Sequence, residues 1–332
     1  MATMTHDRLV AGRSGTTTGL AFAVASAVSF GLSGALARGL LDAGWTAGAA
    51  VSARIAIAAL VLVVPGALAL RGRWHLVRDS RLTVLTYGIA AVAGAQLCYF
   101  YAVSYMQVGV ALLIEYTAPV AVVMWLWLRH GSRPTRLTVV GAVIAALGLV
   151  LVLDVVSGAD LSTTGVLWAL GAMVGAATYF VIGADTENGL PPISLAAAGL
   201  VVGGVVLLAA GWLGVLPMRA TTADVVYDSR VVVWWVPVLA LGLVTAAFAY
   251  VTGIAAGRRL GSRLSSFVAL LEVLMALVFA WVLLGELPRT VQMLGGVLVL
   301  AGVVVVKLGE GASALAVEPL PEEQDLSERP AS

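Results

Sequence analysis

Three ionisable side chains fall inside long apolar stretches of the sequence: Arg54, Glu115 and Glu272. A charged group at the centre of a membrane-spanning helix costs about 2.5–3.5 kcal/mol on insertion scales, so each should face a cavity or a partner instead of lipid. Residues of this kind mark substrate, ion or proton pathways. These three are therefore the first candidates for a functional site.

Depth along the helices suggests how these residues are grouped. Counted from the expected outer end of each helix at about 1.5 Å per residue, Arg54 and Glu115 lie about 11–12 Å deep, and Gln96 lies at a similar depth. We predict that the three form a hydrogen-bonded group that lines a substrate path, with Glu115 as the site for an ammonium group or a proton. The alternative is a purely structural ion pair.

Pro119 and Glu272 extend this candidate site. Pro119 follows Glu115 by four residues and lacks the N–H that the Glu115 carbonyl would otherwise accept. Broken or kinked helices are tolerated within a membrane where they line a cavity, although prolines in spans also serve packing. Glu272 lies about 15 Å into its stretch, close to the bilayer midplane.

Aromatic residues in the apolar stretches are candidates for a cavity wall, although most aromatics in spans pack or anchor at the membrane interface. The residues considered are Tyr99, Tyr101, Tyr116, Trp168, Tyr179, Tyr250 and Trp281. We assign Tyr99, Tyr116, Tyr179 and Tyr250 to the pathway.

The elements that must position these residues are membrane-spanning helices. The chain is 61% hydrophobic and 11% charged, with a mean hydropathy of +1.01, far from the roughly 45–50% apolar and 25% charged residues of soluble domains. Its apolar blocks have the length of a helix that crosses a bilayer. The sequence predicts an all-α integral membrane protein with ten spans, at residues 17–38, 46–70, 82–104, 108–129, 136–154, 164–185, 191–215, 233–256, 262–284 and 289–308.

The distribution of basic residues predicts the orientation. Ten spans put both termini on one side, and only four of the basic residues between spans fall on the other side: Arg38, Arg219, Arg230 and Arg289. By the positive-inside rule both termini lie in the cytoplasm. We therefore expect a cytoplasmic tail at residues 1–16 and a disordered, acidic cytoplasmic tail at residues 309–332.

Composition also excludes several classes of function. A net charge of +1 gives no field for nucleic acid, and a single cysteine with histidines only in the N-terminal tail and loops offers no metal spacing. No cofactor is expected, and no Gly-rich lysine loop indicates nucleotide hydrolysis. The first apolar stretch exceeds the length of a signal-peptide core, so we expect a retained helix. The expected partners are a small-molecule substrate and the bilayer, with protons as a candidate coupling ion, in a monomer or a homodimer.

An internal repeat organises the ten spans. At one ungapped offset of 154 residues Trp127 falls on Trp281, Pro134 on Pro288 and Gly131 on Gly285. We therefore expect two five-helix units, at 17–154 and 164–308. Because five is an odd number, the second unit enters the membrane from the opposite side, and the two units are inverted repeats.

Glycines at the repeat positions predict close helix packing. Gly141 and Gly148 are seven residues apart, as are Gly295 and Gly302, so each pair lies on one helix face. Small residues of this kind let two helices approach closely. The last span of each unit should therefore pack against the other.

Two segments carry a resemblance to a known family: LLIEYTAPV at residues 112–120 and LLEVLMALVFAWVLLGELP at residues 270–288. With Arg54 and the glycines they make the chain similar to the EamA branch of the drug/metabolite transporter superfamily, over residues 17–308. The resemblance implies ten helices in two inverted repeats and export of small metabolites. The IEYTAP segment is most similar to the threonine/homoserine exporter group. Val273 and Ser132 depart from the family pattern, which places a proline and a glutamate there.

We therefore expect a secondary transporter of the bacterial cytoplasmic membrane that exports amino acids by alternating access. A sugar, nucleotide-sugar or drug transporter of the same architecture is the alternative. An intramembrane enzyme is a remote one, because the sequence has no HExxH, GxSxG or intramembrane Asp pair.

Overall fold

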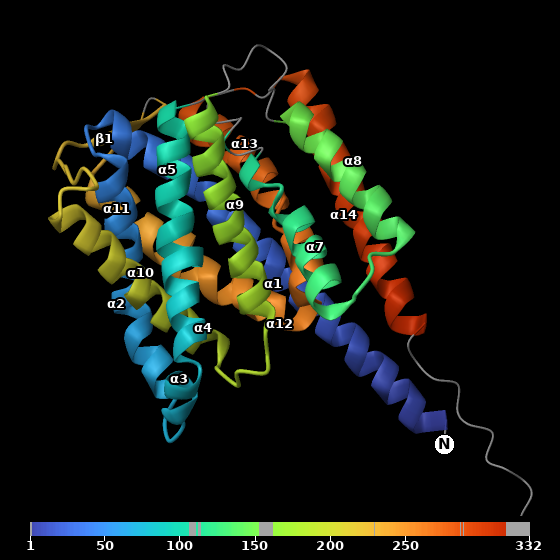
Figure 1. Ribbon diagram of the computed structural model, residues 1–332. Helices are drawn as coiled ribbons and strands as arrows, with labels where there is room; N and C mark the ends of the chain where they lie inside the picture. Colours follow the sequence, from blue (N-terminus) through green and yellow to red (C-terminus); the bar gives the residue numbers. More distant parts are fainter. Residues whose placement is uncertain are drawn as a thin grey trace, which may run out of the picture.

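A computed structural model of the chain describes residues 2–105, 111, 114–152, 162–228, 230–285, 287 and 289–316. Over these residues the protein is almost entirely helical, with one two-stranded hairpin (Figure 1). The predicted helical class is confirmed for them. The hairpin was not predicted.

The helices and strands follow one another along the chain with short connections. They are α1 (Ala2–Asp42), α2 (Ala47–Ala69), α3 (His75–Asp79), α4 (Arg81–Thr86), the π-helical segment η1 (Tyr87–Gly94), α5 (Ala95–Tyr105), α7 (Ala118–His130), α8 (Arg136–Val152), α9 (Thr163–Ala184), α10 (Pro192–Trp212), β1 (Val225–Tyr227), β2 (Arg230–Val232), α11 (Trp235–Gly242), the π-helical segment η3 (Leu243–Phe248), α12 (Ala249–Val268), α13 (Leu271–Leu284) and α14 (Thr290–Ala316).

Seven of the described helices are long and apolar enough to cross a membrane: Thr16–Asp42, Ala47–Ala69, Arg81–Tyr99, Thr163–Ala184, Pro192–Trp212, Trp235–Val268 and Thr290–Gly309. Three further apolar helices are shorter, at Ala118–Arg129, Arg136–Leu151 and Leu271–Leu284. Large apolar side chains on their outward faces are exposed, for example Leu128 at 78% and Trp212 at 87%. Such a surface suits contact with lipid, so the chain is a multi-pass membrane protein.

Two of the predicted spans are interrupted instead of continuous. In the stretch predicted as 108–129 the backbone turns at Tyr116–Thr117 and α7 begins at Ala118. Pro119 then lies in the first helical turn, where its missing N–H has no intrahelical partner to lose. Residues 108–110, 112 and 113 of this span lie outside the described residues.

The stretch predicted as 262–284 is also interrupted. The backbone turns at Ala269–Leu270, and α13 begins at Leu271 with Glu272 in its first turn. A negative charge in the first turn of a helix is favourable because the helix dipole is positive there. The loop expected before this span is a sharp kink within α12, where Gly261 has φ of 77°.

Three features recur at positions 154 residues apart. The two turns fall within one residue of matching places, because Tyr116–Thr117 corresponds to 270–271 and the second turn is at Ala269–Leu270. The helices that follow them, α7 and α13, end on glycines with positive φ, Gly131 at 67° and Gly285 at 72°. The π-helical segments η1 and η3 also occupy matching stretches. The two halves therefore share local structure as well as sequence.

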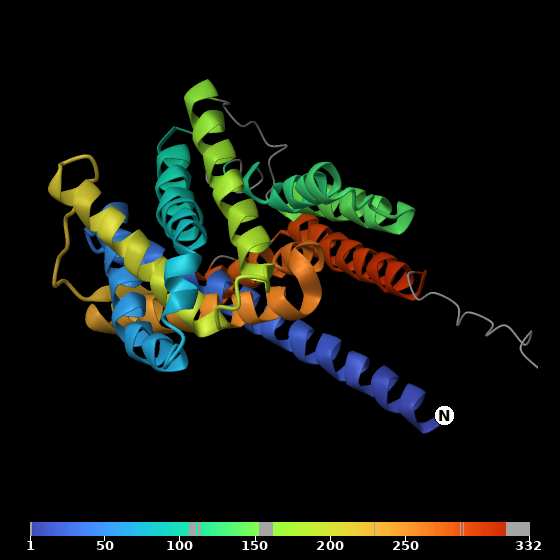
Figure 2. The same cartoon turned by 60° about the horizontal axis from the view of Figure 1, so that its bottom comes forward.

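The expected close packing of the glycine helices is present. A Cβ atom on Gly141 would meet the Gly302 carbonyl oxygen at 2.7 Å, and one on Gly148 would meet the Gly295 carbonyl oxygen at 2.7 Å. Because the order of contacts is reversed, α8 and α14 run antiparallel, and they lie side by side in both views of the molecule (Figures 1 and 2).

A second pair of equivalent helices, α2 and α10, also packs in opposite directions. Gly66, near the end of α2, lies against Ala197, near the start of α10, and the Ser194 hydroxyl donates to the Gly66 carbonyl at 2.9 Å. At the other end of the pair Gly48 lies against Pro217, which follows α10. The same antiparallel packing of equivalent helices is thus found at two places in the fold.

Loops gather at two opposite ends of the bundle. At one end the Tyr227 hydroxyl of the hairpin donates to the Leu36 carbonyl, and the Trp45 indole N–H donates to the Thr221 carbonyl, both at 2.9 Å. At the other end Arg258 donates from Nε to the Gly183 carbonyl and from Nη2 to the Asn188 side-chain oxygen. Chain segments that are far apart in sequence are thereby held together at each end.

Both predicted tails differ from the structure. Residues 309–316, which we expected in the disordered tail, continue α14 as far as Ala316, because four of these eight residues are alanine or leucine, which favour the helix. Residues 317–332 lie outside the described residues. Helix α1 likewise begins at Ala2, within the expected N-terminal tail.

We predict that Gly148→Ala destabilises the protein, because the new methyl group would push α8 away from α14. Overpacking of this kind costs about 1–3 kcal/mol. Gly34→Ala is the matched control, since nothing lies within 4 Å of its added Cβ in the middle of α1. Thermal unfolding of the detergent-purified variants should show a melting temperature lowered by a few degrees for Gly148→Ala and unchanged or raised for Gly34→Ala. Equal shifts would contradict the packing argument.

Candidate functional site

The two helix interruptions border one cavity at the centre of the bundle. The volume of the cavity is about 110 Å³. Its wall is built from α1, η1, α5, α7, α9, α12 and α13, and it is lined by Ala23, Ser26, Ala27, Phe30, Ala91, Ala95, Gln96, Glu115, Tyr116, Ala118, Pro119, Ala176, Tyr179, Phe180, Tyr250, Gly253, Ala256, Ser265, Ser266, Ala269 and Glu272. Both halves of the chain contribute to it.

Seven of the nine residues assigned to the pathway from the sequence line this cavity. They are Gln96, Glu115, Tyr116, Pro119, Tyr179, Tyr250 and Glu272. The remaining two, Arg54 and Tyr99, do not line it.

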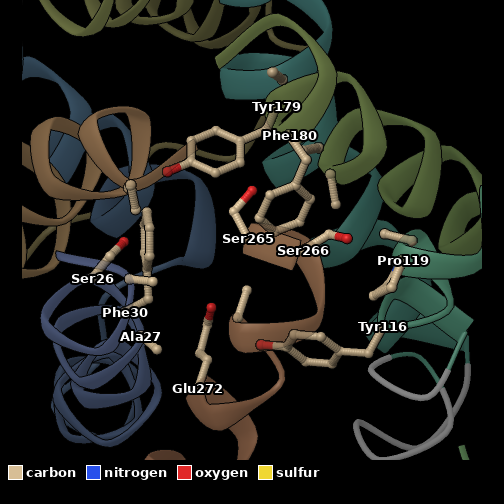
Figure 3. A pocket seen from close by; sticks show the side chains of 18 of the residues that line it. Ser26, Ala27, Phe30, Tyr116, Pro119, Tyr179, Phe180, Ser265, Ser266 and Glu272 are labelled. Carbon is tan, nitrogen blue, oxygen red and sulfur yellow. The ribbon is translucent and has the colours of Figure 1, made fainter. Parts of the chain in front are cut away.

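Two carboxyl groups give the cavity its charge. Glu115 immediately precedes the first helix interruption, and Glu272 lies in the first turn of the helix that follows the second. They are close enough to interact electrostatically. The Tyr116 hydroxyl points toward Glu272 (Figure 3). Two carboxylates in a low-dielectric interior repel each other, so a bound ammonium group or a proton stabilises the pair.

Three serine hydroxyls add hydrogen-bond acceptors. Ser265 donates to the Gly261 carbonyl at 2.7 Å, Ser266 to the Arg263 carbonyl at 2.7 Å and Ser26 to the Ala249 carbonyl at 2.9 Å. Each hydroxyl has one hydrogen, which is thereby engaged, and it keeps oxygen lone pairs for another group. The carboxylates and serine hydroxyls of the cavity therefore favour a ligand that donates hydrogen bonds.

Aromatic side chains close one side of the cavity. Phe30 packs edge-on against Tyr250, with ring centroids 5.3 Å apart, and Tyr179 packs edge-on against Tyr250 at 5.6 Å. Tyr87, fully buried, continues the cluster at 6.0 Å from Tyr179. A side chain on Gly253 would overlap the Tyr179 hydroxyl, so the absence of a Cβ there lets α12 approach this cluster.

The predicted group of Arg54, Gln96 and Glu115 is not formed. Arg54 is buried in α2 and donates from Nη2 to the carbonyl of Thr245 in η3 at 2.6 Å. Arg38–Asp42 is the ion pair found among the described residues, so Arg54 and Glu115 do not pair there. Equal depth along the helices does not bring Arg54 and Glu115 into contact, because α2 packs against η3 and α10 and not against the helix interruption that carries Glu115.

The other aromatic candidates are not among the residues that line the cavity. Tyr99 packs beside Ala102 and Ala169. Tyr101 stacks on Trp168 with centroids 4.9 Å apart, and the Trp281 side chain is 51% exposed on the outside of the bundle. These positions are typical of packing and of membrane anchoring.

Sequence reasoning missed five polar or aromatic residues of the wall: Ser26, Phe30, Phe180, Ser265 and Ser266. The adjacent serines at 265 and 266 were the available signal, since paired hydroxyls in a span need acceptors. Their bonds to carbonyls three and four residues earlier are also what serines in any helix make, so the signal is weak.

Comparison with known proteins identifies the class. The sequence model of the EamA-like transporter family matches the chain twice, at residues 17–154 and 163–308. The chain belongs to this family. It is therefore a membrane transporter built from two copies of the family unit, as the resemblance in sequence predicted.

Individual relatives agree with this assignment. The threonine/homoserine exporter RhtA of Salmonella typhimurium strain LT2 is 27% identical over 250 residues, which are 73% of this chain and 75% of the relative. RhtA of Escherichia coli strain K12 is 28% identical over the same shares. A solved crystal structure of a 20% identical protein superposes with a TM-score of 0.69 over 89% of this chain and 98% of its own, which shows a shared fold.

We predict that the cavity is reachable by small hydrophilic reagents. In a Cys98→Ala background, Ala269→Cys should react with a small methanethiosulfonate reagent, because Ala269 lies half-buried on the cavity wall. Ser194→Cys is the matched control, buried at 2% exposure between α10 and α2. Labelling rates measured by mass spectrometry should differ at least tenfold. Equal rates would show that the cavity is closed to water.

Proposed function

We propose that this EamA-family transporter exports small zwitterionic amino acids, of the threonine and homoserine kind, across the bacterial cytoplasmic membrane. The observation that carries the proposal is the acceptor-rich cavity at the helix interruptions, with Glu115 and Glu272 in its wall. An ammonium group supplies the positive charge that such a wall lacks, together with three donors for its carboxylate and hydroxyl oxygens.

The composition of the wall favours a small amphiphile. The wall also includes apolar side chains, against which a short aliphatic side chain can pack: those of Ala27, Phe30, Ala176 and Phe180. The named relatives are threonine/homoserine exporters, which agrees with a substrate of this size and polarity.

We propose ten crossings in two inverted five-helix repeats, with both termini in the cytoplasm. Seven long and three shorter apolar helices supply the crossings. The antiparallel packing of the equivalent pairs α8 with α14 and α2 with α10 supports the inversion. The bias of arginines toward the loops on the side of the termini supports the orientation. Two inverted units around one cavity suit alternating access, in which rocking opens the cavity to each side in turn.

The main alternative is a sugar, nucleotide-sugar or drug transporter of the same architecture. Nucleotide sugars carry phosphates, which two carboxylates in the wall would repel. Neutral sugars carry no positive charge, so they would leave the repulsion between Glu115 and Glu272 uncompensated. A cationic drug fits the charge of the cavity. The flux measurement must therefore distinguish transport of amino acids from transport of cationic drugs.

We predict that inverted membrane vesicles containing the protein take up labelled threonine or homoserine. Purified protein in liposomes, with an imposed pH gradient and without one, then tests coupling. Uptake that rises when the vesicle interior is acidic indicates exchange for protons at the two carboxyls. Uptake that does not depend on the pH gradient indicates facilitated transport. Uptake of cationic drugs without any amino acid would overturn the proposed substrate class.

We predict that Glu272→Gln and Glu115→Gln each lower threonine uptake at least tenfold, because an amide offers the ammonium group no charge and half of its polar atoms are donors. Asp42→Asn is the matched control, since Asp42 forms an exposed ion pair with Arg38 at the end of α1. The readout is initial uptake rate at equal protein level. Full activity of both glutamine variants would contradict the role of the cavity.

A further inference from the structure

Arg54 is a buried cation next to the cavity without a counter-ion among the described residues. Its side chain is 7% exposed, its Nη2 donates to the Thr245 carbonyl at 2.6 Å, and its Nε finds no hydrogen-bond partner. A guanidinium group has five N–H donors in a planar fork that matches a carboxylate. A neutral carbonyl leaves most of this capacity unused, which is costly inside a membrane.

One layer of aromatic side chains separates Arg54 from the cavity. The guanidinium carbon of Arg54 lies 5.7 Å from the centre of the Phe30 ring, and Phe30 lines the cavity. Tyr250 also lines the cavity, packs against Phe30 and interacts electrostatically with Arg54. Phe30 stands at the margin of the cavity with its ring seen edge-on (Figure 3).

The carboxyl groups across the cavity complement this cation. Glu272 attracts Arg54 electrostatically, although the two form no ion pair. A ligand that carries both charges, with its ammonium end toward Glu272 and its carboxylate end toward Arg54, would neutralise both sides at once. An α-amino acid has this charge pattern over a short distance.

We propose that Arg54 is the carboxylate-binding residue of this transporter, screened by Phe30 and Tyr250 in this structure and brought into contact with the substrate when the Phe30 ring turns aside. This inference rests on the proposed function and deepens it. Arg54 thereby selects amino acids over amines, amides and drugs that lack a carboxylate.

The test compares the binding of threonine with that of its carboxamide, which keeps the ammonium and hydroxyl groups and lacks only the negative charge. Equilibrium binding of both to the purified full-length protein in lipid nanodiscs gives the ratio of their affinities. A charge-assisted bidentate contact contributes about ten- to a hundredfold, so the wild type should prefer threonine by that factor.

Arg54→Gln should abolish this preference by weakening threonine binding and leaving carboxamide binding within about twofold. Arg54→Lys should restore part of it, because the charge returns without the fork. If Arg54 only held α2 to η3, Arg54→Gln would weaken both ligands equally, and this outcome would overturn the inference.

Phe30→Leu provides a test that does not depend on removing the arginine. The smaller leucine side chain covers less of Arg54, so the substrate carboxylate reaches the guanidinium group more easily. The preference for threonine over its carboxamide should therefore rise several-fold. An unchanged or lower preference contradicts the inference. If the wild-type protein binds threonine and its carboxamide equally well, the role of Arg54 fails while the proposed function stands. If it binds neither, the proposed function fails and the inference falls with it.

Discussion

Hydrocarbon cannot hydrogen-bond to a peptide group, and the rest of this structure depends on that constraint. Wherever a spanning helix is interrupted, the freed backbone groups must be buried against protein or face a polar cavity. The described part of the chain includes two such interruptions, at Tyr116–Thr117 and at Ala269–Leu270, and both border the same cavity. The intramembrane carboxyl groups lie beside these interruptions, so one interior space accommodates the polar backbone and the charges together.

The duplication of the family unit explains why two helix interruptions border the same cavity. Equivalent helices meet in opposite directions, α8 against α14 through Gly141, Gly148, Gly295 and Gly302, and this contact sets the halves around a common centre. The halves are unequal in chemistry. Glu115 precedes the turn in the first half, whereas Glu272 follows the turn in the second and corresponds to Ala118. The paired serines Ser265 and Ser266 belong to the second half, and the buried Arg54 belongs to the first, so a ligand in the cavity meets two different surfaces.

The sequence predicts the membrane class, the duplication and most of the charged site, because these depend on local signals: apolar blocks of spanning length, matched tryptophans and prolines, and single charges in apolar runs. The turn at Ala269–Leu270 could not be predicted, because residues 264–284 contain no glycine or proline and the expected proline is Val273. The hydrogen-bond partner of Arg54 could not be predicted from the sequence either. It is the backbone carbonyl of Thr245, whose identity depends on the packing of α2 against η3 and not on any side-chain pattern.

Direct observation of threonine within the protein would test the central claim that the cavity between the interrupted helices is the substrate site. Difference density between structures determined with and without saturating threonine is the measurement. The account predicts density in this cavity, with the amino nitrogen about 2.7–3.2 Å from a carboxyl oxygen of Glu115 or Glu272 and the carboxylate turned toward Arg54. An empty cavity at saturating threonine, or density bound elsewhere along the helices, would contradict it.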